Sequence, residues 1–207
     1  MEGMWTKFSP AFLDLTALVR SGRIGEVRSV QASFGASFPR ETGSRWSAEL
    51  GGSALLDQGI YTVMLARAML GEPLRVSAHG TFFAPGVDES EWVTLEHANG
   101  AVSQLASSMV QWIDPSASAN GTDGYIRVNA PFWATTSIDI HTGSAEDILF
   151  RAEHRSYEIE GNGFVPMIRS VAGALLEGRR ESDVHPLRET LAGFEVLDSI
   201  RAAIRGV

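Results

Sequence analysis

The chain has 207 residues, 44% of them hydrophobic and 20% charged, which is enough to bury one sizeable core. It contains no cysteine, which excludes disulfide frameworks, thiolate metal sites and cysteine nucleophiles. A net charge of −8, with one short basic cluster at Arg179-Arg180 between two glutamates, argues against a nucleic-acid partner. No run approaches the roughly 20 apolar residues of a membrane helix, and no signal peptide is evident, so we expect a soluble, cytoplasmic protein without a membrane partner.

The first residues predict an extended run, a helix and a strand. Residues 1–8 are strand-like, and Ser9-Pro10 has the N-cap and first-turn signature of a helix that ends just before Gly22. In residues 27–34 apolar and polar side chains alternate, as in a strand with one wet face.

A long loop and a helix follow. Residues 35–50 have no hydrophobic period and predict a loop of a length that is often functional. After Gly51-Gly52 an apolar helical pattern begins, and Gly71 and Pro73 end it.

Residues 75–160 carry strand and turn signals. The segments 92–97 and 101–110 flank Asn99-Gly100, a dipeptide favoured in type I′ turns, and therefore predict a hairpin. Further strands are predicted at 125–129, 136–141, 148–152 and 157–160.

Two helices, at 164–177 and 187–204, complete the pattern, with Pro186 in a first-turn position for the second. Strands and helices are segregated along the chain. This order predicts an α+β fold, an open, mostly antiparallel sheet of about six strands with helices packed on one face. The other face would be bare, and a second copy of the sheet is the simplest cover, so we expect a homodimer through the open sheet face.

The densest group of chemically useful residues follows the glycine pair. Asp57 and Tyr61 are four residues apart, and so on one face if the segment is helical. A carboxylate and a phenol can then point into one cleft, although a phenol with an ordinary pKa near 10 needs a cation or relay to act as a proton donor. The alternative is local: Asp57 caps the helix and Tyr61 packs at the edge of the core.

The pattern Gly-Gly-x-x-x-x-Asp-x-Gly-x-Tyr at 51–61, preceded by Arg45-Trp46, resembles the signature of the Gfo/Idh/MocA family, in particular its dihydrodiol dehydrogenase and glucose-fructose oxidoreductase branch. Other members of the family have His at the position of Tyr61. Further stretches fit the same branch in the same order: 2–10 (EGMWTKFSP), 22–27 (GRIGEV), 121–133 (GTDGYIRVNAPFW), 161–164 (GNGF) and 181–190.

The resemblance implies specific roles. Tyr61 resembles the proton donor or acceptor at the reacting carbinol, and Asp57 the carboxylate that helps to orient the substrate. The hydride would come from NAD or NADP, held by a dinucleotide-binding (Rossmann) domain that also supplies a lysine in a Glu-Lys-Pro motif. Neither that motif nor Gly-x-Gly-x-x-Gly occurs here.

The resemblance also implies a domain division. Residues 1–8 resemble the last strand of a missing Rossmann domain, which we expect to be frayed or borrowed by another contact, and residues 9–207 resemble the substrate-binding and oligomerisation domain. We therefore expect no tight cofactor binding by this chain alone. A Rossmann domain supplied in trans is a further possible partner.

The pattern says less about the roles of the other polar and aromatic residues. The five histidines show no metal-ligand spacing, so no metal site is predicted. Trp112 and Trp133 are candidates to line a substrate pocket, with core packing as the alternative. Arg45 and Trp46 lie in the long loop, where contact with a ligand and simple surface anchoring are both open.

Two functions are therefore open. The first is the C-terminal half of an NAD(P)-dependent oxidoreductase acting on a secondary alcohol or ketone of a sugar, cyclitol or diol, inactive alone. The alternative is a non-catalytic, sheet-mediated oligomer or a module that binds a small polar ligand.

Overall fold

The structure is a computed structural model that describes residues 2–40 and 43–206. Its α-helices are α1 (Pro10–Arg20), α2 (Ile60–Leu70), α3 (Ala145–Phe150), α4 (Val165–Leu176) and α5 (Leu187–Arg205). Its strands are β1 (Val27–Gly35), β2 (Arg75–Ala84), β3 (Val87–Glu96), β4 (Val102–Ser108), β5 (Ala117–Gly121), β6 (Gly124–Val128), β7 (Ser137–Thr142) and β8 (Glu153–Ser156). Short helical turns are η1 (Trp5–Phe8), η2 (Ser44–Trp46), η3 (Ala48–Leu50), η4 (Leu55–Gly59), η5 (Ala98–Gly100) and η6 (Phe132–Ala134).

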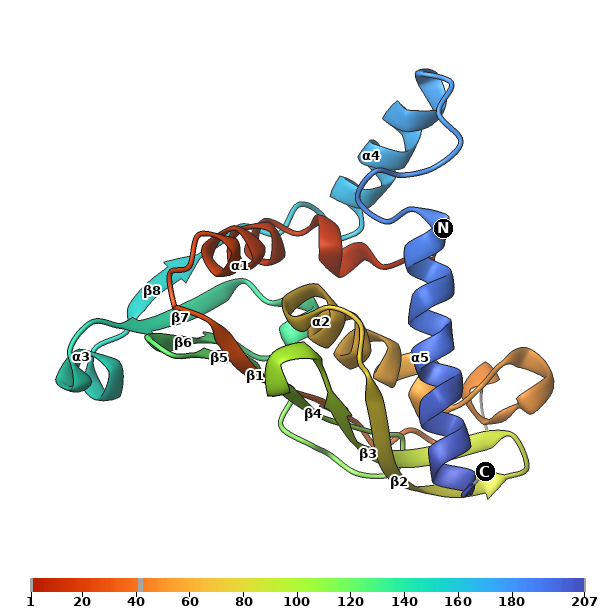
Figure 1. Cartoon of the computed structure of the whole chain (residues 1–207). Helices are drawn as coiled ribbons and strands as arrows, with labels where there is room; N and C mark the ends of the chain where they lie inside the picture. Colours follow the sequence, from red (N-terminus) through yellow and green to blue (C-terminus); the bar gives the residue numbers. More distant parts are fainter. Residues whose placement is uncertain (1, 41–42, 207) are drawn as a thin grey trace.

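The strands form one eight-stranded open sheet in the order β2-β3-β4-β1-β5-β6-β7-β8. Only β1 and β4 pair in parallel, and the other neighbouring strands are antiparallel. Helices α1, α2 and α5 lie over one face of the sheet (Figure 1). The α+β class with helices on one face is confirmed, with more strands than the six expected.

The core lies between this helical layer and the sheet. It is made of apolar side chains that alternate along the strands and face apolar stripes of the helices. Its fully buried members include Leu15, Ile24, Leu55, Leu95, Ile126, Ile138, Ile140, Leu197 and Ile200. The opposite sheet face has no helix on it in the part of the chain that the structure describes (Figure 1).

Several local signals are confirmed by the structure. The Ser9 hydroxyl accepts a hydrogen bond from the Phe12 amide at 3.2 Å and caps α1, and Gly22 has a φ of +74° just beyond its end. Asn99 and Gly100 both have positive φ, 57° and 72°, between β3 and β4, which pair as a hairpin. No described helix is long and apolar enough to cross a membrane.

Two strand predictions in the second half are wrong. Residues 148–152 fall largely in α3, because Ser144 and Asp147 form a reciprocal capping box that starts a helix there. The strand expected at 157–160 lies earlier, as β8, because the residues that pair with β7 are Glu153–Ser156; one further backbone bond, from the Tyr157 amide to the Thr136 carbonyl at 2.8 Å, follows its end.

The strand-like run expected at 1–8 is also different. Residue 1 lies outside the described residues, and Trp5–Phe8 form the 3-10 turn η1 rather than a strand. Met4 and Phe8 are buried, so the turn is packed onto the domain.

Candidate functional site

The glycine pair before Asp57 brings the preceding loop against the helix. A Cβ on Gly52 would lie 2.2 Å from the Ser44 carbonyl oxygen and 2.4 Å from the Arg45 carbonyl oxygen, so only glycine fits. The close approach permitted by Gly52 therefore serves this chain's own loop. It places Arg45 beside the start of the helix.

The segment after the glycines begins as the π-helical turn η4 and becomes regular only in α2. Asp57 lies in η4 and Tyr61 in the first turn of α2, so the regular four-residue helical spacing expected between them is altered. Each side chain has its own partner.

Asp57 pairs with Arg45. The Nε atom of Arg45 donates to Oδ2 of Asp57 at 2.6 Å, and the two side chains are 43% and 35% exposed. The guanidinium also lies 4.3 Å from the Phe38 ring centroid, a cation–π contact that holds its position. A half-exposed ion pair of this kind presents both a donor and an acceptor to a hydroxylated ligand.

Tyr61 is half-buried, and its hydroxyl oxygen accepts a hydrogen bond from Nε1 of Trp5 at 3.2 Å. Burial raises the pKa of the phenol above its ordinary value of 10.0; the Trp5 bond opposes the shift, and the charges of Asp57 and Glu2 add to it. Within residues 2–40 and 43–206, no cation is among the groups that shift this pKa. The phenol is therefore protonated at neutral pH.

Aromatic rings lie beside this phenol and beside one another. The Phe34 ring lies 6.2 Å from Tyr61 and stacks on Trp133 at 3.4 Å, while Trp5 lies 4.9 Å from Phe164. We call these five residues the aromatic cluster. Its members come from η1, β1, α2, η6 and the approach to α4, so the whole domain is needed to assemble it.

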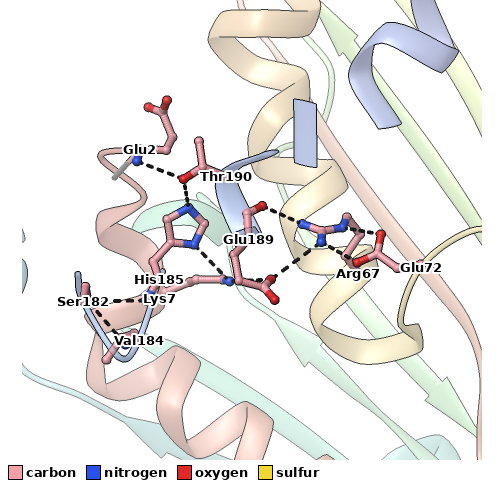
Figure 2. Close-up of polar contacts among 9 residues, drawn as sticks. All are labelled: Glu2, Lys7, Arg67, Glu72, Ser182, Val184, His185, Glu189 and Thr190. Carbon is pink, nitrogen blue, oxygen red and sulfur yellow. Dashed lines mark hydrogen bonds and ion pairs between the residues drawn. The ribbon is translucent and has the colours of Figure 1, made fainter. Parts of the chain in front are cut away.

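The N-terminal segment that carries Trp5 is held by a polar network (Figure 2). Nζ of Lys7 donates to Nδ1 of His185 at 3.2 Å and lies 3.7 Å from Glu189 on α5. Arg67 on α2 pairs with the same Glu189 at 3.6 Å. Burial lowers the pKa of His185 to about 4, so its neutral ring accepts the lysine proton donor.

Three of the predicted site residues are brought together, namely Asp57, Tyr61 and Arg45, and Trp133 joins them through Phe34. Trp46 is buried against a small second core, where Nε1 donates to the Pro39 carbonyl at 2.9 Å. Trp112 is 79% exposed. Substrate contact by Trp46 or Trp112 stays a prediction.

Sequence reasoning missed the roles of Trp5, Phe34 and Phe164. Trp5 and Phe164 lie in stretches that carry the family resemblance, GMWTKF and GNGF, which was the available signal. In the sequence Phe34 has the pattern of an ordinary strand residue. Its position beside Tyr61 depends on how α2 crosses β1, which the sequence pattern does not reveal.

Comparison with known proteins identifies the family of the chain. Residues 12–127 match the family profile described as the GFO/IDH/MocA C-terminal domain. A trans-1,2-dihydrobenzene-1,2-diol dehydrogenase from Oryctolagus cuniculus is 30% identical over 99% of this chain and 63% of its own length, and one from Xenopus tropicalis is 30% identical over 96% and 60%. A solved 3-ketoreductase, KijD10 from Actinomadura kijaniata, in complex with NADP and TDP-benzene, superposes with a TM-score of 0.81 at 25% identity over 97% of this chain and 61% of its own. The chain thus spans about three fifths of the relatives it matches, and it belongs to the GFO/IDH/MocA family, as a C-terminal domain.

Proposed function

We propose that this chain is the substrate-binding half of an NAD(P)-dependent oxidoreductase that acts on a secondary alcohol or ketone of a sugar, cyclitol or diol. The observation that supports this most directly is the neutral Tyr61 phenol beside the Asp57–Arg45 pair, in a domain of this family.

Each group has a role in that reaction. In reduction, the Tyr61 hydroxyl donates its proton to the carbonyl oxygen; in oxidation, its conjugate base takes the proton of the alcohol. Asp57 accepts a hydrogen bond from a neighbouring substrate hydroxyl, and Arg45 holds that carboxylate in place. The nicotinamide, when bound, supplies or takes the hydride. Because burial raises the Tyr61 pKa, the phenol needs a cation from outside these residues to release its proton near neutral pH.

The aromatic cluster bears on the class of substrate. Trp5 donates to the Tyr61 hydroxyl, Phe34 lies beside the Tyr61 ring, and Trp133 stacks on Phe34. Such surfaces stack on the apolar face of a six-membered ring, while the ion pair binds its hydroxyls. A cyclic diol fits both, and the trans-1,2-dihydrobenzene-1,2-diol dehydrogenases to which the chain is similar are named for such a diol.

Helix α4 suggests where a cofactor-binding domain docks. It stands off the body of the molecule (Figure 1), and only Ala174 among its residues is buried. Ile168, Leu175 and Leu176 are 60%, 66% and 90% exposed. The helix begins beside Phe164, which packs on Trp5, so a domain that covers α4 also reaches the aromatic cluster. Whether it is joined covalently or acts in trans, we expect this chain to be inactive without it.

The open sheet face is the proposed dimer interface. It is lined by polar side chains around Trp92, which is 44% exposed and lies beside His79, with ring centroids 6.4 Å apart. Protein interfaces are enriched in tryptophan at their centre and have polar side chains at their rim.

The function is tested by ligand binding to the chain itself. In ¹H–¹⁵N NMR spectra, trans-1,2-cyclohexanediol should shift the indole signals of Trp5 and Trp133 with a Kd on the order of millimolar. Tyr61→Phe and Asp57→Asn should weaken these shifts severalfold, whereas Tyr125→Phe, on the open sheet face, should not. In parallel, NADH or NADPH with carbonyl compounds should give no turnover. Shifts confined to the open sheet face, or turnover by the chain alone, would contradict the proposal.

A further inference from the structure

Two acidic side chains are buried beneath the turn that carries Asp57. Asp88 and Glu91, both on β3, are 0% and 1% exposed. Burying a carboxylate is costly unless hydrogen bonds and an opposite charge compensate it. Their partners therefore indicate what the pair does.

Asp88 holds the first residues of η4. Its Oδ2 accepts a hydrogen bond from the Leu55 amide at 2.7 Å, which satisfies a donor at the helix start. Its Oδ1 lies 3.3 Å from Nη2 of Arg201, which projects from α5. One carboxylate thus ties the start of the turn to a helix more than 100 residues away in sequence.

The same guanidinium reaches the residue that supports Asp57. Nη2 of Arg201 donates to the Ser53 hydroxyl at 3.2 Å, and that hydroxyl accepts from the Leu56 amide at 3.1 Å. The Asp57 amide in turn donates to the Ser53 carbonyl at 3.0 Å. The backbone of Asp57 is therefore two contacts from Arg201.

Glu91 supports the other end of the turn. Its Oε1 accepts a hydrogen bond from the Ser107 hydroxyl on β4, and a Cβ on Gly59 would lie 3.0 Å from both Oε1 and that hydroxyl. Gly59 is thus pressed against the Glu91–Ser107 pair. The side-chain amide of Gln58, buried between these points, makes no hydrogen bond with the described residues, so it does not hold the turn.

We propose that Asp88 and Glu91 are positioning residues: together they fix the π-helical turn from below, and thereby set the approach of Asp57 and Tyr61 to each other and to the substrate. This inference rests on the proposed function for the roles of Asp57 and Tyr61. The positioning itself can be tested without any substrate.

The two acids differ in their surroundings. Burial, and next the charge of Asp88, raise the pKa of Glu91 well above its ordinary value, which favours its neutral form. Asp88 instead has Arg201 as its ion-pair partner, at 3.3 Å. The charged groups that face the pair are accordingly Arg201 from α5 and the two acids of β3 themselves.

Because the two acids have different partners, two matched substitutions should behave differently in the isolated chain. Glu91→Gln keeps the shape of the side chain and an oxygen that can accept from the Ser107 hydroxyl, and it should leave the NMR spectrum of η4 and α2 nearly unchanged. Asp88→Asn removes the charge that binds the Leu55 amide and Arg201. It should lower the hydrogen-exchange protection of Leu55 and Asp57 by at least about tenfold. It should also shift the Trp5 indole signal, which reports the position of the Tyr61 hydroxyl, while amides of α1 keep their protection.

A milder variant covers the case in which Asp88→Asn does not fold. Ser53→Ala removes only the hydroxyl shared by Arg201 and Leu56, and it should show the same local loss of protection to a smaller extent. Asp198→Asn, on the exposed side of α5, is the control. Unchanged protection and an unchanged indole signal in both Asp88→Asn and Ser53→Ala would overturn the proposal. Because no diol or nicotinamide is used, failure here is separate from failure of the proposed function.

Discussion

At the residue scale, Tyr61 is coupled to Asp57 by charge and not by a direct bond. Asp57 is bonded to Arg45, and Tyr61 to Trp5, yet the Asp57 charge contributes to the raised pKa of the phenol. The pair was identifiable from sequence by its glycine context. Its separate partners were not, because a π-helical turn and a distant loop decide them.

Asp57→Asn should lower the pKa of Tyr61 towards its ordinary value. Removing the carboxylate removes a charge that disfavours the phenolate and leaves the Arg45 guanidinium without its partner. The titration can be followed by the ¹³Cζ signal of Tyr61, assigned with Tyr61→Phe. A raised native pKa also means that the unfolded chain ionises first, so the contribution of Tyr61 to stability is complete below pH 10 and is lost as the pH rises through the native value.

Glu158→Gln is a suitable control for that titration, since Glu158 is an exposed acid and is not among the groups that shift the phenol. A Tyr61 pKa that rises, or stays the same, in Asp57→Asn would mean that the carboxylate does not act on the phenol.

At the element scale, helices with clear start and stop signals were predictable, and strands with little side-chain signal were not. Ser9-Pro10 and Gly22 bound α1 as expected. β5 (ASANG) was missed because it has no β-branched or aromatic residue, and its pairing with β1 and β6 makes it a strand. The turn η1 differs from the strand predicted there because its conformation depends on contacts of Lys7 and Thr6 with residues more than 120 positions away.

The network that fixes η1 should make the chain sensitive to mild acid. His185 is 4% exposed and has a native pKa of about 4 against an ordinary 6.5, and it faces Lys7, Arg67 and Glu189. Between these pH values the unfolded chain binds a proton that the native state does not, so stability falls as the pH falls. The loss from pH 6.5 to 4.5 should be about 2–3 kcal/mol.

His185→Asn keeps an acceptor for Lys7 but cannot be protonated, so its stability should fall less over this range. Urea unfolding at both pH values measures the difference, with His79→Asn, an exposed histidine of β2, as the control. His97, whose pKa burial also lowers, accounts for part of the loss of stability with falling pH that remains in His185→Asn. An equal loss of stability between the two pH values in wild type and in His185→Asn would show that the His185 ring is not held neutral.

At the scale of the whole molecule, two uncovered surfaces lie on opposite sides of the sheet. One is the open sheet face around Trp92, and the other is the exposed side of α4, which projects from the helical layer (Figure 1). The segregated order of strands and helices allowed the first to be predicted. The second was hidden, because the apolar period of residues 164–177 looks the same whether its apolar face is buried or exposed.

A charged substitution on each surface would show which of the two forms the contact between copies. Trp92→Glu places a carboxylate in the proposed self-interface and should weaken dimerisation by at least about tenfold in sedimentation equilibrium, because the charge would have to be desolvated without a partner. Leu176→Glu, at a side chain that is 90% exposed, should leave the dimer intact, since α4 is proposed to meet a cofactor-binding domain and not a second copy. If Leu176→Glu dissociates the chain while Trp92→Glu does not, then α4 is the contact between copies. A cofactor-binding domain would then have to compete with self-association for the surface nearest to Tyr61.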